Sequence, residues 1–117
     1  MWSRFKQVCD IVMLYRNHSN LLISRTVILL IPKLAKLIPD AFLRGYSKEM
    51  MDYLCFLLSS SKAEPLHDTC FSVIGSLAQI IPTTVIQYQQ QIFNRIEQIL
   101  THYIEHNEHS DQMTKHT

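Results

Sequence analysis

The chain has 117 residues, of which 47% are hydrophobic and 18% charged, and its formal net charge is +1 at pH 7. This length allows one small domain, and the composition is that of an ordinary globular protein. Because the Lys and Arg residues are scattered, no concentrated basic face exists, and we expect no nucleic-acid partner.

The sequence gives no sign of export or membrane insertion. Its first residues enter helical periodicity at once, without the apolar core and cleavage site of a signal peptide. Apolar runs such as Val27 to Ile31 are far shorter than the roughly 20 residues that span a bilayer. The three cysteines, Cys9, Cys55 and Cys70, are odd in number and form no CxxC. We therefore expect reduced cysteines and a cytoplasmic protein without a transmembrane segment.

Apolar periodicity predicts two helices in the first third of the chain. The first covers about 2–16, and its apolar face is formed by Phe5, Val8, Cys9, Val12 and Tyr15. A polar turn over 16–20 follows, in which Ser19 or Asn20 can cap the next helix. That helix runs over about 21–38 as one element, with a kink near 28–31 caused by Pro32.

Three further helices are expected, separated by proline and glycine signals. Pro39 ends the second helix or opens a connecting turn through Leu43. The third helix covers 47–59 with Ser47 as its N-cap, and 59–64 is a loop. Pro65 suits the first turn of a fourth helix over 65–81. The fifth starts after Pro82, is firmest over 89–106, and leaves a polar, disordered tail at 107–117.

The most informative pattern is an internal repeat. Residues 23–39 align with residues 66–82 at a constant offset of 43, which pairs Leu34 with Leu77 and Pro39 with Pro82. The first helix aligns with the third at an offset of 42, and the third with the fifth at 43, so that Met50 corresponds to Phe93. Helical repeats of about 40–47 residues are typical of HEAT and armadillo proteins.

The predicted fold class is therefore all-α, a HEAT/armadillo-type α-solenoid of antiparallel helix pairs with about two and a half repeats. We expect a solenoid segment over 1–106 and the tail over 107–117. Within the segment, repeat one covers about 2–38, repeat two about 40–81, and a half repeat about 83–106.

Such an array needs neighbours at its ends. The second helix is apolar around much of its circumference, and we expect neighbouring elements to cover Leu21, Leu22, Ile28, Leu29 and Leu30. Two alternatives remain open from the residues alone: the chain is a slice of a longer solenoid, or it self-associates through its open ends.

Two arrangements invite a catalytic interpretation, and neither is accepted. His102-Tyr-Ile-Glu-His106 fits the H-x-x-E-H zinc-peptidase pattern, but it lacks a third ligand and lies near the end of the helical pattern. Incidental metal binding by His102, His106 and His109 is the more reasonable alternative. Cys70 lies one turn from His67, but it aligns with Val27 and is expected in the core. We predict no catalytic, cofactor-binding or metal-binding residue, no cofactor, and a chain that is not itself an enzyme.

Three other features are interpreted structurally. The glutamine run 87–91 is expected to form a polar helix face, and Met50 and Met51 are expected in the core. Asp10 and Asp52 are interpreted as solvated surface charges.

Two blocks of the sequence resemble the N-terminal HEAT region of target-of-rapamycin (TOR) serine/threonine kinases. The first is Arg25-Thr-Val-Ile-Leu-Leu-Ile-Pro-Lys-Leu-Ala35, followed by Pro39, Phe42, Tyr46, Met51, Tyr53-Leu54 and Leu57-Leu58; the second is Phe71-Ser-Val-Ile-Gly-Ser-Leu-Ala78. The resemblance extends over about 5–78.

The resemblance implies a fragment of a very large kinase, in a part that carries none of the kinase elements. It implies protein partners such as raptor-like TOR complex subunits and neighbouring HEAT repeats. We therefore predict a non-catalytic helical scaffold segment for protein–protein interaction in nutrient and growth signalling. The alternative is a free-standing small HEAT-type adaptor that self-associates through its uncapped ends.

Overall fold

The protein is all-α over the residues that the computed structural model describes, which are 2–115 for the backbone and 3–106 for side chains. Seven α-helices are present in this range: α1 (Trp2–Tyr15), α2 (Leu21–Leu37), α3 (Pro39–Gly45), α4 (Ser47–Ser59), α5 (His67–Ile80), α6 (Pro82–Ile86) and α7 (Gln89–Lys115). A 3₁₀-helix, η1 (Ser61–Leu66), precedes α5. None of these helices is long and apolar enough to cross a membrane. The predicted tail at 107–117 lies outside the residues whose side chains are described.

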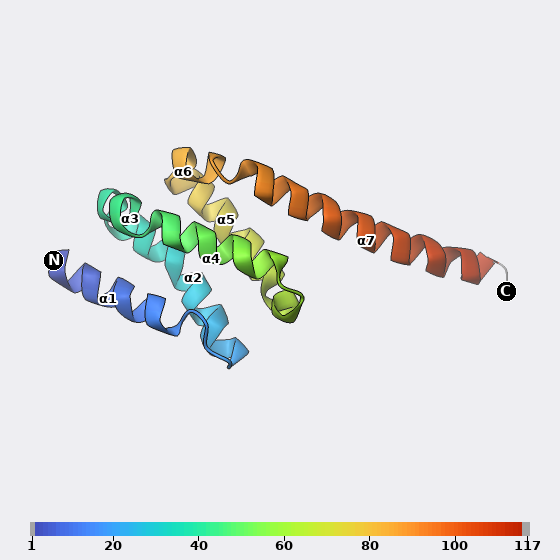
Figure 1. Cartoon of the computed structure of the whole chain (residues 1–117), viewed down its shortest axis with the longest axis horizontal. Coiled ribbons are helices and arrows are strands. Elements are labelled where there is room, and N and C mark those ends of the chain that lie inside the picture. Colours follow the sequence, from blue (N-terminus) through green and yellow to red (C-terminus); the bar gives the residue numbers. More distant parts are fainter. Residues whose placement is uncertain (1, 116–117) are drawn as a thin grey trace.

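The helices form two layers in an elongated molecule of 65 × 31 × 17 Å. Figure 1 shows α1, α4 and α7 in one layer, with α2 and α5 behind them. Among the closest neighbours, α2 packs against α5 and α1, and α4 packs against α5 and α7. The long helix α7 follows α4 at first and then extends past the other helices (Figure 1).

The order long helix, short helix, long helix occurs twice, as α2–α3–α4 and as α5–α6–α7. Each first helix ends at an isoleucine with similar non-helical backbone angles, φ −139° and ψ 81° at Ile38 and φ −131° and ψ 63° at Ile81. A proline then begins each short helix, at Pro39 and Pro82, where its missing N–H costs no helical hydrogen bond. The sequence repeat is therefore also a repeat of backbone conformation.

Most predicted boundaries agree with the structure. Asn20 caps α2, since its side chain accepts a 2.9 Å hydrogen bond from the Leu22 N–H. α2 continues through Pro32 as one helix, as expected.

Two local predictions are wrong. Ser47 is not an N-cap: it lies inside α4, is buried, and donates its hydroxyl to the Leu43 carbonyl 2.6 Å away. Since the Met50 N–H bonds back to the Tyr46 carbonyl, the helical path continues into α4 and leaves Ser47 no cap to make. The expected loop at 59–64 is mostly the 3₁₀-helix η1, which includes Pro65, so α5 begins at His67 and not at the proline.

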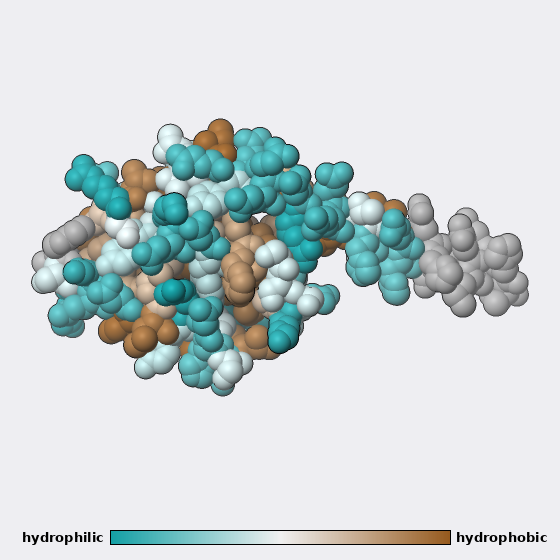
Figure 2. All heavy atoms as spheres, viewed as in Figure 1, coloured by the Kyte–Doolittle hydropathy of each residue, from teal (hydrophilic) through white to brown (hydrophobic). Residues whose placement is uncertain are grey.

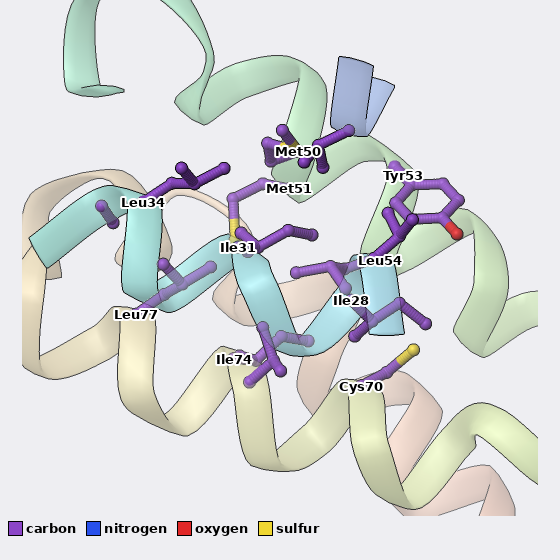
Figure 3. Packing of buried hydrophobic residues seen from close by; sticks show 14 of the residues in the cluster. Ile28, Ile31, Leu34, Met50, Met51, Tyr53, Leu54, Cys70, Ile74 and Leu77 are labelled. Carbon is purple, nitrogen blue, oxygen red and sulfur yellow. The ribbon is translucent and has the colours of Figure 1, made fainter. Parts of the chain in front are cut away.

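The core lies between the layers. Figure 3 shows Ile74 and Leu77 pointing from α5 toward α2, with side chains of α2 and α4 packed in the same cluster. Leu77 is fully buried and Leu34 is 5% exposed. Ile28, expected to need a neighbouring element, is already covered within the chain, whereas Leu21, Leu22, Leu29 and Leu30 remain exposed.

Candidate interaction surfaces

One face of α4 is directed at α1. Its residues follow the 4-3-4 spacing of a single helix face: Tyr46, Met50, Tyr53 and Leu57. The Tyr46 ring packs edge-on against Phe5 with centroids 6.2 Å apart, and the Tyr53 hydroxyl donates to the Arg16 carbonyl. Met50 is fully buried on this face, and Tyr53 and Leu57 are 6% and 8% exposed.

The same layer contains a hydrogen bond that is made twice. The Tyr46 hydroxyl donates to Asp10 Oδ1 over 3.1 Å, and the Tyr88 hydroxyl donates to Asp52 Oδ1 over 2.8 Å. Each pair is separated by 36 residues, and the second pair lies 42 residues after the first in both members. Burial, followed by the bond to the carboxylate, raises the pKa of each tyrosine to about 12. The junction of α1 with α4 and the junction of α4 with α7 therefore contain the same Tyr–Asp hydrogen bond.

Asp10 and Asp52 are exposed, as predicted, but they are more than solvated charges, because each accepts a tyrosine hydroxyl. Sequence reasoning missed this pair. The sequence does carry a signal for it, since both residue types recur at the offset of 42 that relates α1 to α4.

The equivalent face of α1 has no covering helix within the chain. An offset of 42 takes Val8 to Met50, Ile11 to Tyr53 and Tyr15 to Leu57. The exposed fractions are 39%, 56% and 46% in α1, against 0%, 6% and 8% in α4. Figure 2 shows brown patches along the lower edge of the body, where Figure 1 places α1 and the start of α2. The positions that α1 covers on α4 are therefore solvent-exposed on α1 itself.

α2 continues this open surface. An offset of 43 takes Ile23 to Leu66 and Leu30 to Val73, which are 3% and 2% exposed, while Ile23 and Leu30 are 36% and 37% exposed. Between the two helices lies an apolar groove of about 330 Å³, lined by Arg4, Phe5, Val8, Leu34, Leu37 and Ile38. We call the surface formed by Arg4, Val8, Ile11, Tyr15, Ile23, Leu30 and Leu37 the α1–α2 face.

The outer side of α7 is a second open surface, and it corrects the predicted register of the fifth helix. Phe93 was paired with Met50, but Phe93 is 56% exposed and Met50 is fully buried. An offset of 42 pairs Met50 with Ile92, which is 8% exposed, and pairs Phe93 with Met51. Because Met51 is fully buried in α4, the exposed Phe93 marks a position that is covered in α4 and open in α7.

The cysteine and histidine pair on α5 is structural. Cys70 is fully buried, and burial raises its thiol pKa to about 12, which opposes formation of the thiolate that a nucleophile needs. His67 is also buried, and its Nε2 lies 2.9 Å from the Leu57 carbonyl and 3.0 Å from the Ser60 carbonyl. The core interpretation of Cys70 is confirmed.

The two histidines of the zinc-like motif lie exposed on α7, with stacked rings whose centroids are 6.4 Å apart. They border an open pocket of about 490 Å³ between α7 and the start of α5. Within the described residues, no three His, Cys, Asp or Glu side chains come together as metal ligands. His109 lies outside the residues whose side chains are described.

The other structural interpretations hold. Met50 and Met51 are fully buried, and Gln87, Gln89, Gln90 and Gln91 are exposed. Tyr88 interrupts the glutamine run, is 8% exposed, and makes the hydrogen bond to Asp52.

The described residues thus define an all-α protein with a duplicated helical unit, whose candidate sites are apolar helix faces. The chain is similar to a small segment of TOR serine/threonine kinases. It is 30% identical over 88 residues to serine/threonine-protein kinase TOR of Oryza sativa subsp. japonica, and 29% identical over 99 residues to serine/threonine-protein kinase tor1 of Schizosaccharomyces pombe.

These matches cover 75% and 85% of the chain but only 3% and 4% of the two kinases. The chain therefore spans a very small part of the curated relatives it matches. No protein-family model matches the chain, and no solved structure matches it.

Proposed function

We propose that this chain is a non-catalytic scaffold segment of a HEAT-type α-solenoid, which stacks helical repeats and presents their open faces to protein partners. The observation that carries the proposal is the Tyr–Asp hydrogen bond made at two successive junctions, Tyr46 to Asp10 and Tyr88 to Asp52. A bond that recurs with the sequence period is expected where identical units are stacked by translation along an array.

The similarity to TOR kinases supports a place for this segment in a large cytoplasmic signalling kinase of that type. In that setting, its neighbours would be further helical repeats, and its partners would include raptor-like complex subunits. The chain itself would contribute no group to phosphoryl transfer, because its buried polar side chains Ser24, Ser47 and His67 are each hydrogen-bonded to a backbone carbonyl.

The size of the natural product tests this proposal. An antibody raised against the chain is used on a denaturing blot of cells that express it. A single band far above 13.7 kDa is expected if the segment belongs to a large kinase. A band near 13.7 kDa contradicts that origin.

The exposed apolar faces favour one second candidate, a free-standing adaptor that self-associates through its ends. Ile11 and Phe93, both 56% exposed, lie on opposite outer helices of the layer. A band near 13.7 kDa together with concentration-dependent association in sedimentation equilibrium would establish this candidate in place of the first.

A further inference from the structure

Two open grooves of the molecule are equivalent by the internal repeat. The first groove lies at the junction of α1 with α4 and has a volume of about 420 Å³, and the second lies at the junction of α4 with α7 and has a volume of about 370 Å³. An offset of 42 takes each of the seven residues that line the first groove to a residue that lines the second. The groove is therefore a feature of the repeating unit.

The ends of the chain do not account for the openness of these grooves. At the first groove, α2 and α5 lie behind the two helices and α7 lies beyond α4, yet the lining residues come only from α1, α4 and the turn after α1 (Figure 1). At the second groove, the preceding helix α1 is in place. Each groove is thus open with the neighbour that the other lacks, and further repeats stacked at either end would leave both open.

In the second groove, neutral amides replace the acidic side chains of the first. Glu49 and Asp52 line the first groove, and their equivalents in the second are Gln91 and Asn94. Asp52 also borders the second groove, where its Oδ2 lies 3.6 Å from the Lys48 ammonium and its Oδ1 takes part in the Tyr–Asp hydrogen bond described above. The second groove therefore repels an anion less than the first does.

A cation stands in the second groove at the position of a neutral phenol in the first. The Tyr53 hydroxyl is satisfied within the fold, because it donates to the Arg16 carbonyl. The equivalent Arg95 guanidinium has one hydrogen-bond partner among the described residues, Gln98, whose Oε1 accepts from Nη1 over 3.1 Å, and its Nε is buried without a partner. Arg95 also borders the pocket between α7 and the start of α5, but it makes no ion pair with the carboxylates described there. A guanidinium with unused donors is suited to a carboxylate.

We propose that the second groove binds an extended segment of a partner protein, with a carboxylate of that segment placed against Arg95. Gln91, Asn94 and Gln98 lie three and four residues apart along α7, and their amides carry donors and acceptors that match exposed peptide groups. An extended segment offers such groups, whereas a helix uses them internally. Phe56, which is 63% exposed at the rim, can cover an apolar side chain beside the carboxylate.

The occupant comes from outside the array, because stacking of repeats leaves the groove open. The inference rests on the proposed scaffold role and names the partner chemistry at one of its surfaces.

The experiment follows proton–nitrogen NMR signals of the full chain during titration with two pools of acetylated and amidated pentapeptides. One pool has glutamate fixed at the centre and mixed residues elsewhere, and the matched pool has glutamine at the centre. The glutamate pool should shift the Arg95 Nε–H signal and the side-chain amide signals of Gln91 and Asn94 in a saturable way. The glutamine pool should bind at least about 10-fold more weakly, as expected when a charge pair with arginine is lost.

Variants of the groove should remove the preference for glutamate. Arg95→Gln should lower the affinity for the glutamate pool to that for the glutamine pool. Gln91→Glu combined with Asn94→Asp copies the acidic residues of the first groove and should weaken binding at least about 10-fold. Arg44→Gln and Gln89→Glu are the matched controls, since they make the same kinds of charge change at exposed residues that do not line the groove.

Circular dichroism checks that each variant is folded. If Arg95→Gln does not fold, the double variant still decides, because Gln91 and Asn94 are exposed.

Three results overturn the proposal: no saturable shift at millimolar concentrations of the glutamate pool, equal affinity for the two pools, or equal losses in the groove variants and their controls. If the groove signals of the free chain instead shift on dilution, a second copy is the occupant and the separate partner is excluded. The blot described above is an independent test. A band near 13.7 kDa would contradict the origin in a large kinase and leave the binding results unchanged.

Discussion

At the scale of single residues, the duplicated Tyr–Asp bond predicts two matched losses of stability. Tyr46→Phe and Tyr88→Phe each remove one hydroxyl donor to a carboxylate, at 3.1 and 2.8 Å. A net hydrogen bond of this kind contributes about 1 kcal/mol, so each variant should lower the unfolding free energy in urea by about that amount. Tyr103→Phe is the control, because Tyr103 is 64% exposed and should cost nothing measurable. A loss at only one junction would show that the two bonds are not equivalent.

The buried thiols and phenols predict a loss of stability at alkaline pH. Burial raises the pKa of Cys70 from 9.0 and of Tyr53 from 10.0, each to about 12. Unfolded chains release these protons at the ordinary values, while the folded chain holds them. The stabilisation is therefore complete below pH 9.0 and is lost as the pH rises from there to about 12.

The measurement is the urea-unfolding free energy at a series of pH values across that window. Cys70→Val is the matched control, since valine is the residue at the equivalent position, Val27, and it carries no ionisable proton. This variant should show a shallower alkaline slope. A free energy that rises with pH through the window would contradict the prediction.

At the scale of elements, a side chain in the first turn of each helix of the rear layer bonds to carbonyls of the segment before that helix. The Ser24 hydroxyl donates to the His18 carbonyl over 2.7 Å, and the His67 ring lies within 3.0 Å of the Leu57 and Ser60 carbonyls. Ser24 and His67 are equivalent at an offset of 43, and they are 4% and 8% exposed. Two different side chains at equivalent positions therefore both bond to backbone carbonyls that precede their own helix.

His67→Ala should destabilise the chain by about 1–3 kcal/mol, because it removes a buried ring that is hydrogen-bonded to the Leu57 and Ser60 carbonyls. Ser24→Ala should act in the same direction with a smaller effect, since it frees one carbonyl. Both are measured by urea unfolding, and His102→Ala on the exposed part of α7 serves as the control. If His67→Ala proved neutral, the ring would not be closing α4.

The same two residues show how far the sequence could predict the structure. Apolar spacing and the paired prolines located the five long helices and the internal repeat, because burial and helix termination depend on residue type. Ser24 and His67 differ in residue type, so their common role could be recognised only from their hydrogen-bond distances to backbone carbonyls. Ser47 failed as a predicted cap for a related reason: a serine hydroxyl bonds equally well to a carbonyl inside a helix, and the path of the backbone decides which.

At the scale of the whole molecule, the register of α7 decides which of its residues face α4, because an offset of 43 in place of 42 rotates the expected contact face. The adjacent apolar pairs Ile92–Phe93 and Ile99–Leu100 fit either offset, and only burial distinguishes the two. The candidate surfaces depend on this distinction. When Phe93 is aligned with the buried Met51, the exposed residues of α7 and α1 occupy positions that are buried in α4.

Because the core of this arrangement holds the helices together, a charge placed in it should unfold the whole chain. Leu34 and Leu77 are equivalent residues that are 5% and 0% exposed; Leu77 points from α5 toward α2 (Figure 3), and Leu34 lies beside Phe5 of α1. Leu34→Asp or Leu77→Asp would bury an unpaired carboxylate, at a cost of several kcal/mol, comparable with the total stability of a small domain. Leu37→Asp is the matched control, since Leu37 is on the same helix but 72% exposed. Loss of helical circular dichroism and of a cooperative melt is expected for the first two variants alone, and native melting of Leu77→Asp would show that the contact between α2 and α5 does not hold the fold together.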